Sequence, residues 1–254
     1  MIFRNKSVSA SPLGLACALV LSQTAFLAHA DLVLETETAE LDKRGDQLIS
    51  TVIQYAREED GSRAWMTVNQ YEIGVTDRAE LLLEPFFYEW DHPKGGKNFS
   101  GVGDLEITPS YMVLLERPML LAVVLALKIK VPTATNRDIG SGELDYYPYL
   151  IFGKTTGDWV FNANFGVDFI KSPHDEPLRD QYIWDFSAER RMTPNWSIYA
   201  EAFGNSRPAV GEDSTAAGAL ATEYRFSNHI NAFISVGYDT DQLLVIRPGF
   251  NIEF

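Results

Sequence analysis

Leu243-Leu244-Val245-Ile246-Arg247-Pro248-Gly249-Phe250-Asn251-Ile252-Glu253-Phe254, the last stretch of the chain, alternates in chemical character. Successive side chains of a β-strand point to opposite sides. One side would carry mostly apolar groups, at Leu244, Ile246, Pro248, Phe250, Ile252 and Phe254. The other side would carry Val245, Arg247, Gly249, Asn251 and Glu253. The pattern predicts a strand with one face against lipid and the other against water.

The same alternation recurs in the middle of the chain. In residues 159–169 every odd position is apolar, and the even positions include Asn162, Asn164 and Asp168. Residues 121–131 alternate in the same way, which directs Lys128 and Lys130 to the side opposite the leucines. A soluble β-sandwich also has alternating strands. The tryptophans favour a membrane barrel instead, because all five lie near expected strand ends, where an interfacial aromatic girdle forms: Trp65, Trp90, Trp159, Trp184 and Trp196.

Strand-like segments fill the chain from residue 46 onward. The longest apolar run after Ala30 spans only residues 119–127, which is too short for a membrane-spanning helix. Without helices, only a closed barrel satisfies every backbone polar group in lipid. Turn residues divide the chain into segments at 46–57, 64–74, 79–90, 102–115, 119–132, 143–153, 159–170, 181–191, 196–204, 216–226, 230–238 and 243–254. We therefore expect an all-β fold, a transmembrane antiparallel up-and-down β-barrel of about 12 strands.

The connections between these segments alternate in length. Residues 75–78, 116–118, 154–158, 192–195 and 227–229 make short turns, whereas 91–101, 133–142, 171–180 and 205–215 make long loops. Short periplasmic turns and long outer loops are typical of outer-membrane barrels of Gram-negative bacteria. The localisation expected from this pattern is the cell outer membrane.

Residues 1–30 have the pattern of a secretory signal peptide. Arg4 and Lys6 precede an apolar run, and Ala28-His29-Ala30 has the small-x-small form of a cleavage site. A membrane-spanning helix is the alternative, and polar residues 22–24 disfavour it. The expected organisation is a signal peptide at residues 1–30, an N-terminal periplasmic or plug segment at 31–45, and a barrel at 46–254. The only cysteine, Cys17, lies in the peptide, so we expect no disulfide after cleavage.

Acidic residues outnumber basic ones. Removing Arg4 and Lys6 from the 21 basic residues leaves 19 against 35 acidic residues. A chain this acidic is a poor nucleic-acid binder, because few of its groups would neutralise phosphates. The outer loops hold many of the acids. Divalent ions would bridge them to lipopolysaccharide, or they simply form a solvated surface.

Several short motifs follow one another in a set order along the chain. Gly101-Val102-Gly103-Asp104-Leu105 opens one segment, Lys130-Val131-Pro132-Thr133 ends the next, and Gly157-Asp158-Trp159 and Glu223-Tyr224-Arg225-Phe226 follow. In this order and spacing they resemble the outer-membrane family of meta-pathway phenol-degradation proteins, regarded as transporters. Ala134 stands where that family usually has Gly. The resemblance implies a barrel for uptake of small, often apolar molecules, and it names no solute and no functional residues.

The closing strand resembles the assembly signal of outer-membrane barrels. Such a strand ends on an aromatic residue, here Phe254. The resemblance implies the barrel-assembly machinery as a partner, with outer-membrane lipid around the assembled protein.

Ionisable residues on the inward side are the candidate lumen lining. Alternation places Glu106, Lys128, Lys130, Asp168, Asp185, Glu189, Glu201, Glu223, Arg225, Arg247 and Glu253 there. Opposed acidic and basic rows would orient a polar solute, as rings of charge do in selective pores. Alternatively, the charges pair with one another in a plugged barrel, with residues 31–46 as the plug.

Catalytic, cofactor and metal residues are not expected. After cleavage three histidines would remain, at His92, His174 and His229, and none lies in the middle of an expected strand. Asp91-His92 and His174-Asp175 are the only adjacent acid–histidine pairs that a barrel hydrolase would use, and solvated loop residues explain both. The favoured function is a channel for passive uptake of small, hydrophobic or aromatic molecules. Its rivals are a closed structural or adhesion barrel and, less favoured, an outer-membrane hydrolase.

Overall fold

The computed structural model describes residues 33–136, 138–171, 178–207 and 213–254. The expected signal peptide, Cys17, His174 and Asp175 lie outside the described residues. None of the described residues forms a helix that is long and apolar enough to cross a membrane. The described chain consists of strands, turns and loops, with the strands β1 (Gln47–Arg57), β2 (Arg63–Thr76), β3 (Ala79–His92), β4 (Phe99–Val102), β5 (Leu105–Leu114), β6 (Ala122–Val131), β7 (Asp145–Thr156), β8 (Trp159–Asp168), β9 (Gln181–Thr193), β10 (Trp196–Asn205), β11 (Thr215–Arg225), β12 (Ile230–Asp239) and β13 (Leu244–Glu253).

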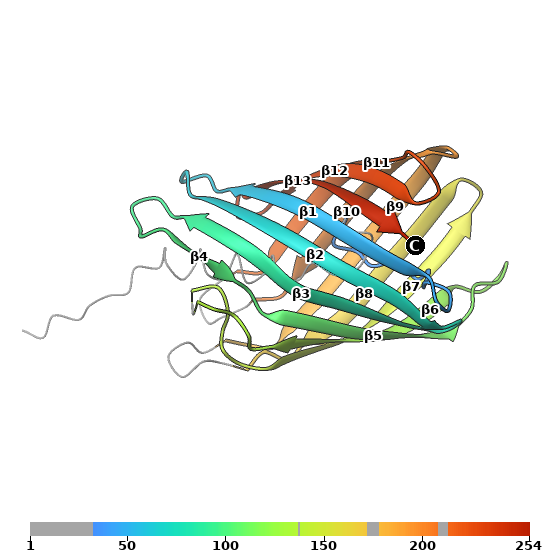
Figure 1. Ribbon diagram of the computed structural model, residues 1–254, viewed down its shortest axis with the longest axis horizontal. Helices are drawn as coiled ribbons and strands as arrows, with labels where there is room; N and C mark the ends of the chain where they lie inside the picture. The colour runs from blue at the N-terminus through green and yellow to red at the C-terminus, as the bar shows by residue number, and fades with distance from the viewer. Residues whose placement is uncertain (1–32, 137, 172–177, 208–212) are drawn as a thin grey trace, which may run out of the picture.

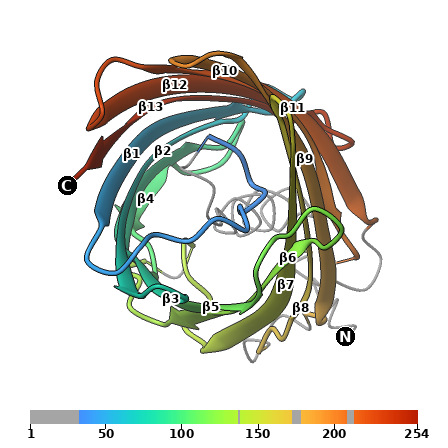
Figure 2. The same cartoon turned by 90° about the vertical axis from the view of Figure 1, so that its right-hand side faces the viewer.

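Twelve of these strands close into one antiparallel barrel (Figures 1 and 2). Each strand pairs with its neighbours in the chain, except that β3 pairs with β5. The ring closes where β1 pairs with β13, with Leu48 opposite Glu253 and Arg57 opposite Leu244. Closure gives each of the twelve barrel strands two neighbours, which is what a sheet in lipid requires. The expected fold class is confirmed.

The short strand β4 is the one departure from the expected strand pattern. The strand expected at residues 102–115 begins only at Leu105, as β5, and β4 lies at residues 99–102, most of which were expected in the long loop 91–101. β4 pairs with the outer end of β3 at residues 88–91, and β5 pairs with its other end at residues 79–84. Between them, Gly103 lies against the ring of Phe87, where a Cβ would come within 1.9 Å of ring carbon Cζ. A glycine is needed at this close approach, and the ladder breaks there.

The two faces of the barrel differ as the alternation predicted. On β6, Val124 and Lys128 are buried inside, whereas Leu125, on the opposite face, is about half exposed. Trp65 and Trp90 face each other across β2 and β3 near the long-loop end, and both are exposed. Trp159 and Trp196 are exposed at the short-turn end. The outer wall thus carries an apolar surface with tryptophans near both ends, as in transmembrane barrels.

The chain preceding β1 lies inside the barrel. Figure 2 shows this segment, drawn in blue, curled within the ring of strands. Val33 and Leu34 pack in an apolar cluster with residues of five strands, including Met66 and Phe233. We call residues 33–46 the N-terminal segment.

Candidate lumen site

The N-terminal segment is held in the lumen by contacts to strands around the ring. Near its start, Glu35 accepts a hydrogen bond from Arg247 of β13, and the backbone N–H and hydroxyl of Thr36 both donate to Glu201 Oε1 of β10. Further along, Tyr149 of β7 donates its hydroxyl proton to Glu37.

The second half of the segment runs to the end of the barrel that carries the short turns. The N–H of Ala39 donates to Asn162 Oδ1 at 3.1 Å. The N–H of Asp42 donates to Glu80 Oε2 at 2.6 Å. Residues 33–46 therefore run through the lumen toward the short turns, in contact with the wall along the way.

Glu37 and Asp42 of the N-terminal segment have raised pKa values, as does Glu35, whose pKa is raised by burial. Burial raises the pKa of Glu37 well above its ordinary value, although Lys128 and the bond from Tyr149 act against this. Burial also raises the pKa of Asp42, and the neighbouring acids Asp46 and Glu253 act in the same direction. These shifts favour the neutral form of the carboxyls in the folded protein.

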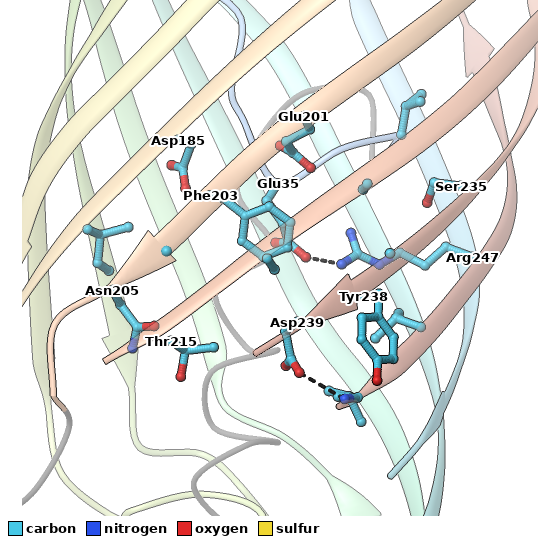
Figure 3. A pocket seen from close by; sticks show the side chains of 18 of the residues that line it. Glu35, Asp185, Glu201, Phe203, Asn205, Thr215, Ser235, Tyr238, Asp239 and Arg247 are labelled. Carbon is cyan, nitrogen blue, oxygen red and sulfur yellow. Dashed lines mark hydrogen bonds and ion pairs between the residues drawn. The ribbon is translucent and has the colours of Figure 1, made fainter. Parts of the chain in front are cut away.

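A cavity of about 100 Å³ lies beyond the start of the N-terminal segment, toward the long loops (Figure 3). Val33 and Glu35 border it, and the rest of its wall comes from β7 and β9–β13. Asn205, Thr215, Asp239 and Leu243 place it at the strand ends that adjoin two outer loops. Its apolar lining is Val33, Ile183, Phe203, Ala217, Ala219, Leu243 and Val245.

Acids dominate the charged groups of this cavity. Among the described residues, Glu35, Asp185, Glu201 and Asp239 line it, against a single basic residue, Arg247. Arg247 is already bound to Glu35. Figure 3 shows these side chains pointing into the cavity from β9, β10, β12, β13 and the N-terminal segment.

The lysines of the expected lumen lining lie in ion pairs away from this cavity. Lys128 Nζ lies 3.0 Å from Glu106 Oε2 and 3.5 Å from Glu84 Oε2, and it is almost fully buried. Lys130 lies beside Asp145 and 4.0 Å from Asp104 Oδ2. These pairs match the paired-charge alternative better than they match opposed rows.

The remaining expected lining residues are distributed along the inner wall. Asp168, Asp185, Glu201, Glu223 and Arg247 are buried inside the barrel, and of these the cavity includes Asp185, Glu201 and Arg247. Glu189 and Glu253 are partly buried, and Arg225 is exposed at the end of β11. A role for any of them in lining a solute path stays a prediction.

Sequence reasoning missed several acids of the lumen. Glu84 binds Lys128, yet it was not among the expected lining residues. Glu80, Leu82 and Glu84 lie two residues apart on the inner face of β3, so the signal was present in the alternation. Glu35 and Glu37 belong to the segment that the sequence offered as a plug, but their partners on the wall had no signal, because the N-terminal segment has no strand periodicity.

Neither of the sequence-level hydrolase pairs forms a described site. Asp91 is buried and His92 is exposed, because adjacent residues of β3 point to opposite sides of the wall. His174-Asp175 lies outside the described residues. Among the residues that the structure describes, one group of acids has the spacing of a cation site: the carboxylate oxygens of Asp42, Glu72 and Glu80 lie within 4.8 Å of one another.

Comparison with known proteins gives one family match in sequence and a fold shared with solved outer-membrane barrels. The family model described as "Putative MetA-pathway of phenol degradation" matches residues 52–248. The COG4313 outer membrane channel from Pseudomonas putida F1 is similar in structure, with a TM-score of 0.71 and 14% identity over 85% of this chain and 98% of that chain. The NanC porin gives a TM-score of 0.61 with 12% identity over 80% of this chain and 98% of that one.

The KdgM porin is a third such structure, with a TM-score of 0.58 and 11% identity over 81% of this chain and 99% of that one. No curated protein sequence matches the chain. The family resemblance drawn from the sequence is confirmed by the family model, and the structural likenesses show that the fold is shared.

Proposed function

Because this chain belongs to the family described as "Putative MetA-pathway of phenol degradation", we propose that it is an outer-membrane channel for the passive uptake of small, largely apolar molecules. The cavity among β9–β13 carries this proposal. Its wall is mainly apolar and lies near the outer loops, where a solute from outside would first enter the barrel. Concave, mostly apolar sites with a few polar groups are the usual form of small-molecule sites.

The fold relatives support the same class of function. The structure most like this chain among the three compared is an outer membrane channel, and the other two are porins. The apolar outer wall supports location in the outer membrane, with lipid as its surroundings. Divalent bridging of the acidic outer loops to lipopolysaccharide stays a prediction.

A closed structural or adhesion barrel is the second candidate. One observation favours it: the N-terminal segment lies inside the lumen, with Glu35, Thr36 and Glu37 hydrogen-bonded to the wall. A channel requires either a path past this segment or its displacement. The two candidates therefore differ in whether solutes cross the outer membrane.

Uptake of N-phenyl-1-naphthylamine into intact cells tests the proposal. This uncharged aromatic probe becomes fluorescent once it has passed the lipopolysaccharide layer. Cells that carry the protein in the outer membrane should take it up faster than cells that lack the protein. A variant with the cavity filled by Ala219→Phe should lower the rate, whereas Leu220→Phe, which faces away from the cavity on the same strand, should not. Equal rates with and without the protein would favour the closed barrel.

A further inference from the structure

Asp185 is the least satisfied charged group of the cavity. It is 7% exposed and lies on β9 with its carboxylate directed into the cavity. Among the described residues no hydrogen bond or salt bridge reaches this carboxylate. The charged groups that act on it are Glu201, Glu35 and Glu37, which are acids, and Lys128, which is held by Glu84 and Glu106.

The neighbouring acid Glu201 is also incompletely paired. Its Oε1 accepts both bonds from Thr36, whereas its Oε2 is buried without a hydrogen-bond partner. The one guanidinium of the cavity, Arg247, is engaged by Glu35. Buried carboxylates are costly unless a cation or hydrogen-bond donors satisfy them. A cationic donor is the group that this cavity lacks.

The apolar wall faces the same space as these acids. Phe203 and Ile183 line the cavity beside Asp185, and Val245 lies on the strand that carries Arg247. The cavity volume of about 100 Å³ is of the same order as an apolar cavity that holds benzene, ~150 Å³. An aromatic ring next to an ammonium group adds a cation–π attraction.

We infer that this cavity selects small apolar or aromatic molecules that carry one protonated amine, with Asp185 accepting the ammonium group and Phe203 and Val245 covering the apolar body. The inference rests on the proposed channel function and narrows its solute. An ammonium donates up to three hydrogen bonds, so it would serve Asp185 and the free oxygen of Glu201 together. A carboxylate-bearing analogue would meet like charges at the same place.

Isothermal titration calorimetry on the full protein, purified from outer membranes in a non-ionic detergent, tests the inference. Three probes share one phenyl ring and differ in the polar group: 2-phenylethylamine, 2-phenylethanol and phenylacetate. At pH 7 and low salt, the amine should bind about tenfold more tightly than the alcohol, as expected for a charge-assisted hydrogen bond. Phenylacetate should bind most weakly. A wild-type protein that binds the amine no more tightly than the alcohol overturns the inference.

Two matched variants test whether Asp185 is the source of the preference for the amine. Asp185→Asn keeps the shape of the side chain and removes its charge, so the preference for the amine should vanish while the affinity for 2-phenylethanol stays. Asp168→Asn makes the same change at a buried carboxylate of β8 outside the cavity, and the preference should remain. An equal loss in both variants would mean that general lumen charge, rather than this site, attracts amines, and would overturn the assignment.

Failure of the inference is separable from failure of the channel function. If the amine shows no preference but the protein still speeds uptake of N-phenyl-1-naphthylamine, the channel function stands and the amine specificity is wrong. If uptake does not depend on the protein, the proposed function fails, and amine binding at Asp185 would not describe a transported solute.

Discussion

Lys128 shows how one residue organises the interior of the barrel. It is 2% exposed and lies between Glu84 of β3 and Glu106 of β5. Two buried carboxylates without a cation would repel each other, so the Lys128 ammonium is what allows Glu84 and Glu106 to lie close together. Replacement by glutamate would place three acids together, which this packing disfavours. The sequence left two roles open for Lys128, lining a solute path or pairing inside a plugged barrel, and the structure shows it paired.

The variant Lys128→Met should destabilise the barrel. It leaves Glu84 and Glu106 buried without their cation, and breaking a buried ion pair in this way costs about 3–5 kcal/mol. The measurement is urea-induced unfolding in lipid vesicles, followed by tryptophan fluorescence. Lys171→Met is the matched control, because Lys171 is exposed and pairs with Glu143 at the surface, so little change is expected. Adding Glu106→Gln to Lys128→Met should restore part of the stability; no restoration would contradict the pairing.

At the scale of elements, the N-terminal segment contacts the inner wall of the barrel, and the closing strand β13 completes the ring by pairing with β1. The segment turns toward β1 beside Gly74 of β2, whose N–H donates to Asp46 O at 3.0 Å and whose carbonyl accepts from the N–H of Gly45 at 2.8 Å. A Cβ on Gly74 would lie 1.9 Å from the carbonyl oxygen of Lys43. This close approach requires glycine and ties the base of the segment to the wall.

The variant Gly74→Ala should loosen the segment and raise ion conductance through the lumen. The added methyl cannot fit against backbone atoms, so the segment must shift away from the wall. Planar-bilayer recording compares it with wild type and with Gly218→Ala, where the added Cβ would make an ordinary contact of 3.5 Å with Glu201 O. Unchanged conductance in a folded Gly74→Ala protein would show that the segment does not limit the passage of ions.

Removing Phe254 should lower the amount of protein in the outer membrane. The residue follows β13, its side chain is exposed, and its N–H donates to Gln47 O of β1 at 2.9 Å. Phe254→Ala keeps this backbone bond and loses only the ring, so a defect as large as that of the deletion would assign the effect to the ring. Immunoblots of outer-membrane fractions measure the levels, with Lys97→Ala in a loop as the control. Wild-type levels of the deletion variant would count against an assembly role.

At the scale of the whole molecule, closure of the sheet determines how the barrel resists unfolding. The pairing of β1 with β13 removes both edges of the sheet, and the outward face is apolar on every side of the ring. Because each strand bonds to two neighbours, a single strand cannot detach without breaking two ladders.

The whole barrel should therefore resist sodium dodecyl sulfate until it is heated. Unheated protein from outer-membrane fractions should migrate faster on a gel than boiled protein, and its circular dichroism should show β-structure. Recovery of the protein in the soluble periplasmic fraction, with no shift on heating, would contradict the membrane barrel.

The sequence by itself determined the class of fold and most strand positions. Alternation depends only on the geometry of a strand in a two-sided environment, so segments such as 159–170 and 196–204 needed no knowledge of their partners. The unequal loops and the tryptophans then indicated a membrane barrel. The break between β4 and β5 was missed because it depends on Gly103 meeting Phe87, a contact between segments.

Only the tertiary structure decided which charges meet and what fills the lumen. Alternation gives the side of the wall that a residue faces, but not the residue across the interior. Lys128 thus met Glu84 and Glu106, and Asp185 has no hydrogen-bond or ion-pair partner among the described residues in a mainly apolar cavity. The N-terminal segment has no periodicity, so the sequence offered its place in the lumen only as one alternative, and contacts such as Glu35 with Arg247, 212 residues apart in the chain, decided for it. Contacts between residues so distant in sequence form only after the barrel closes, and for that reason the sequence pattern does not encode them.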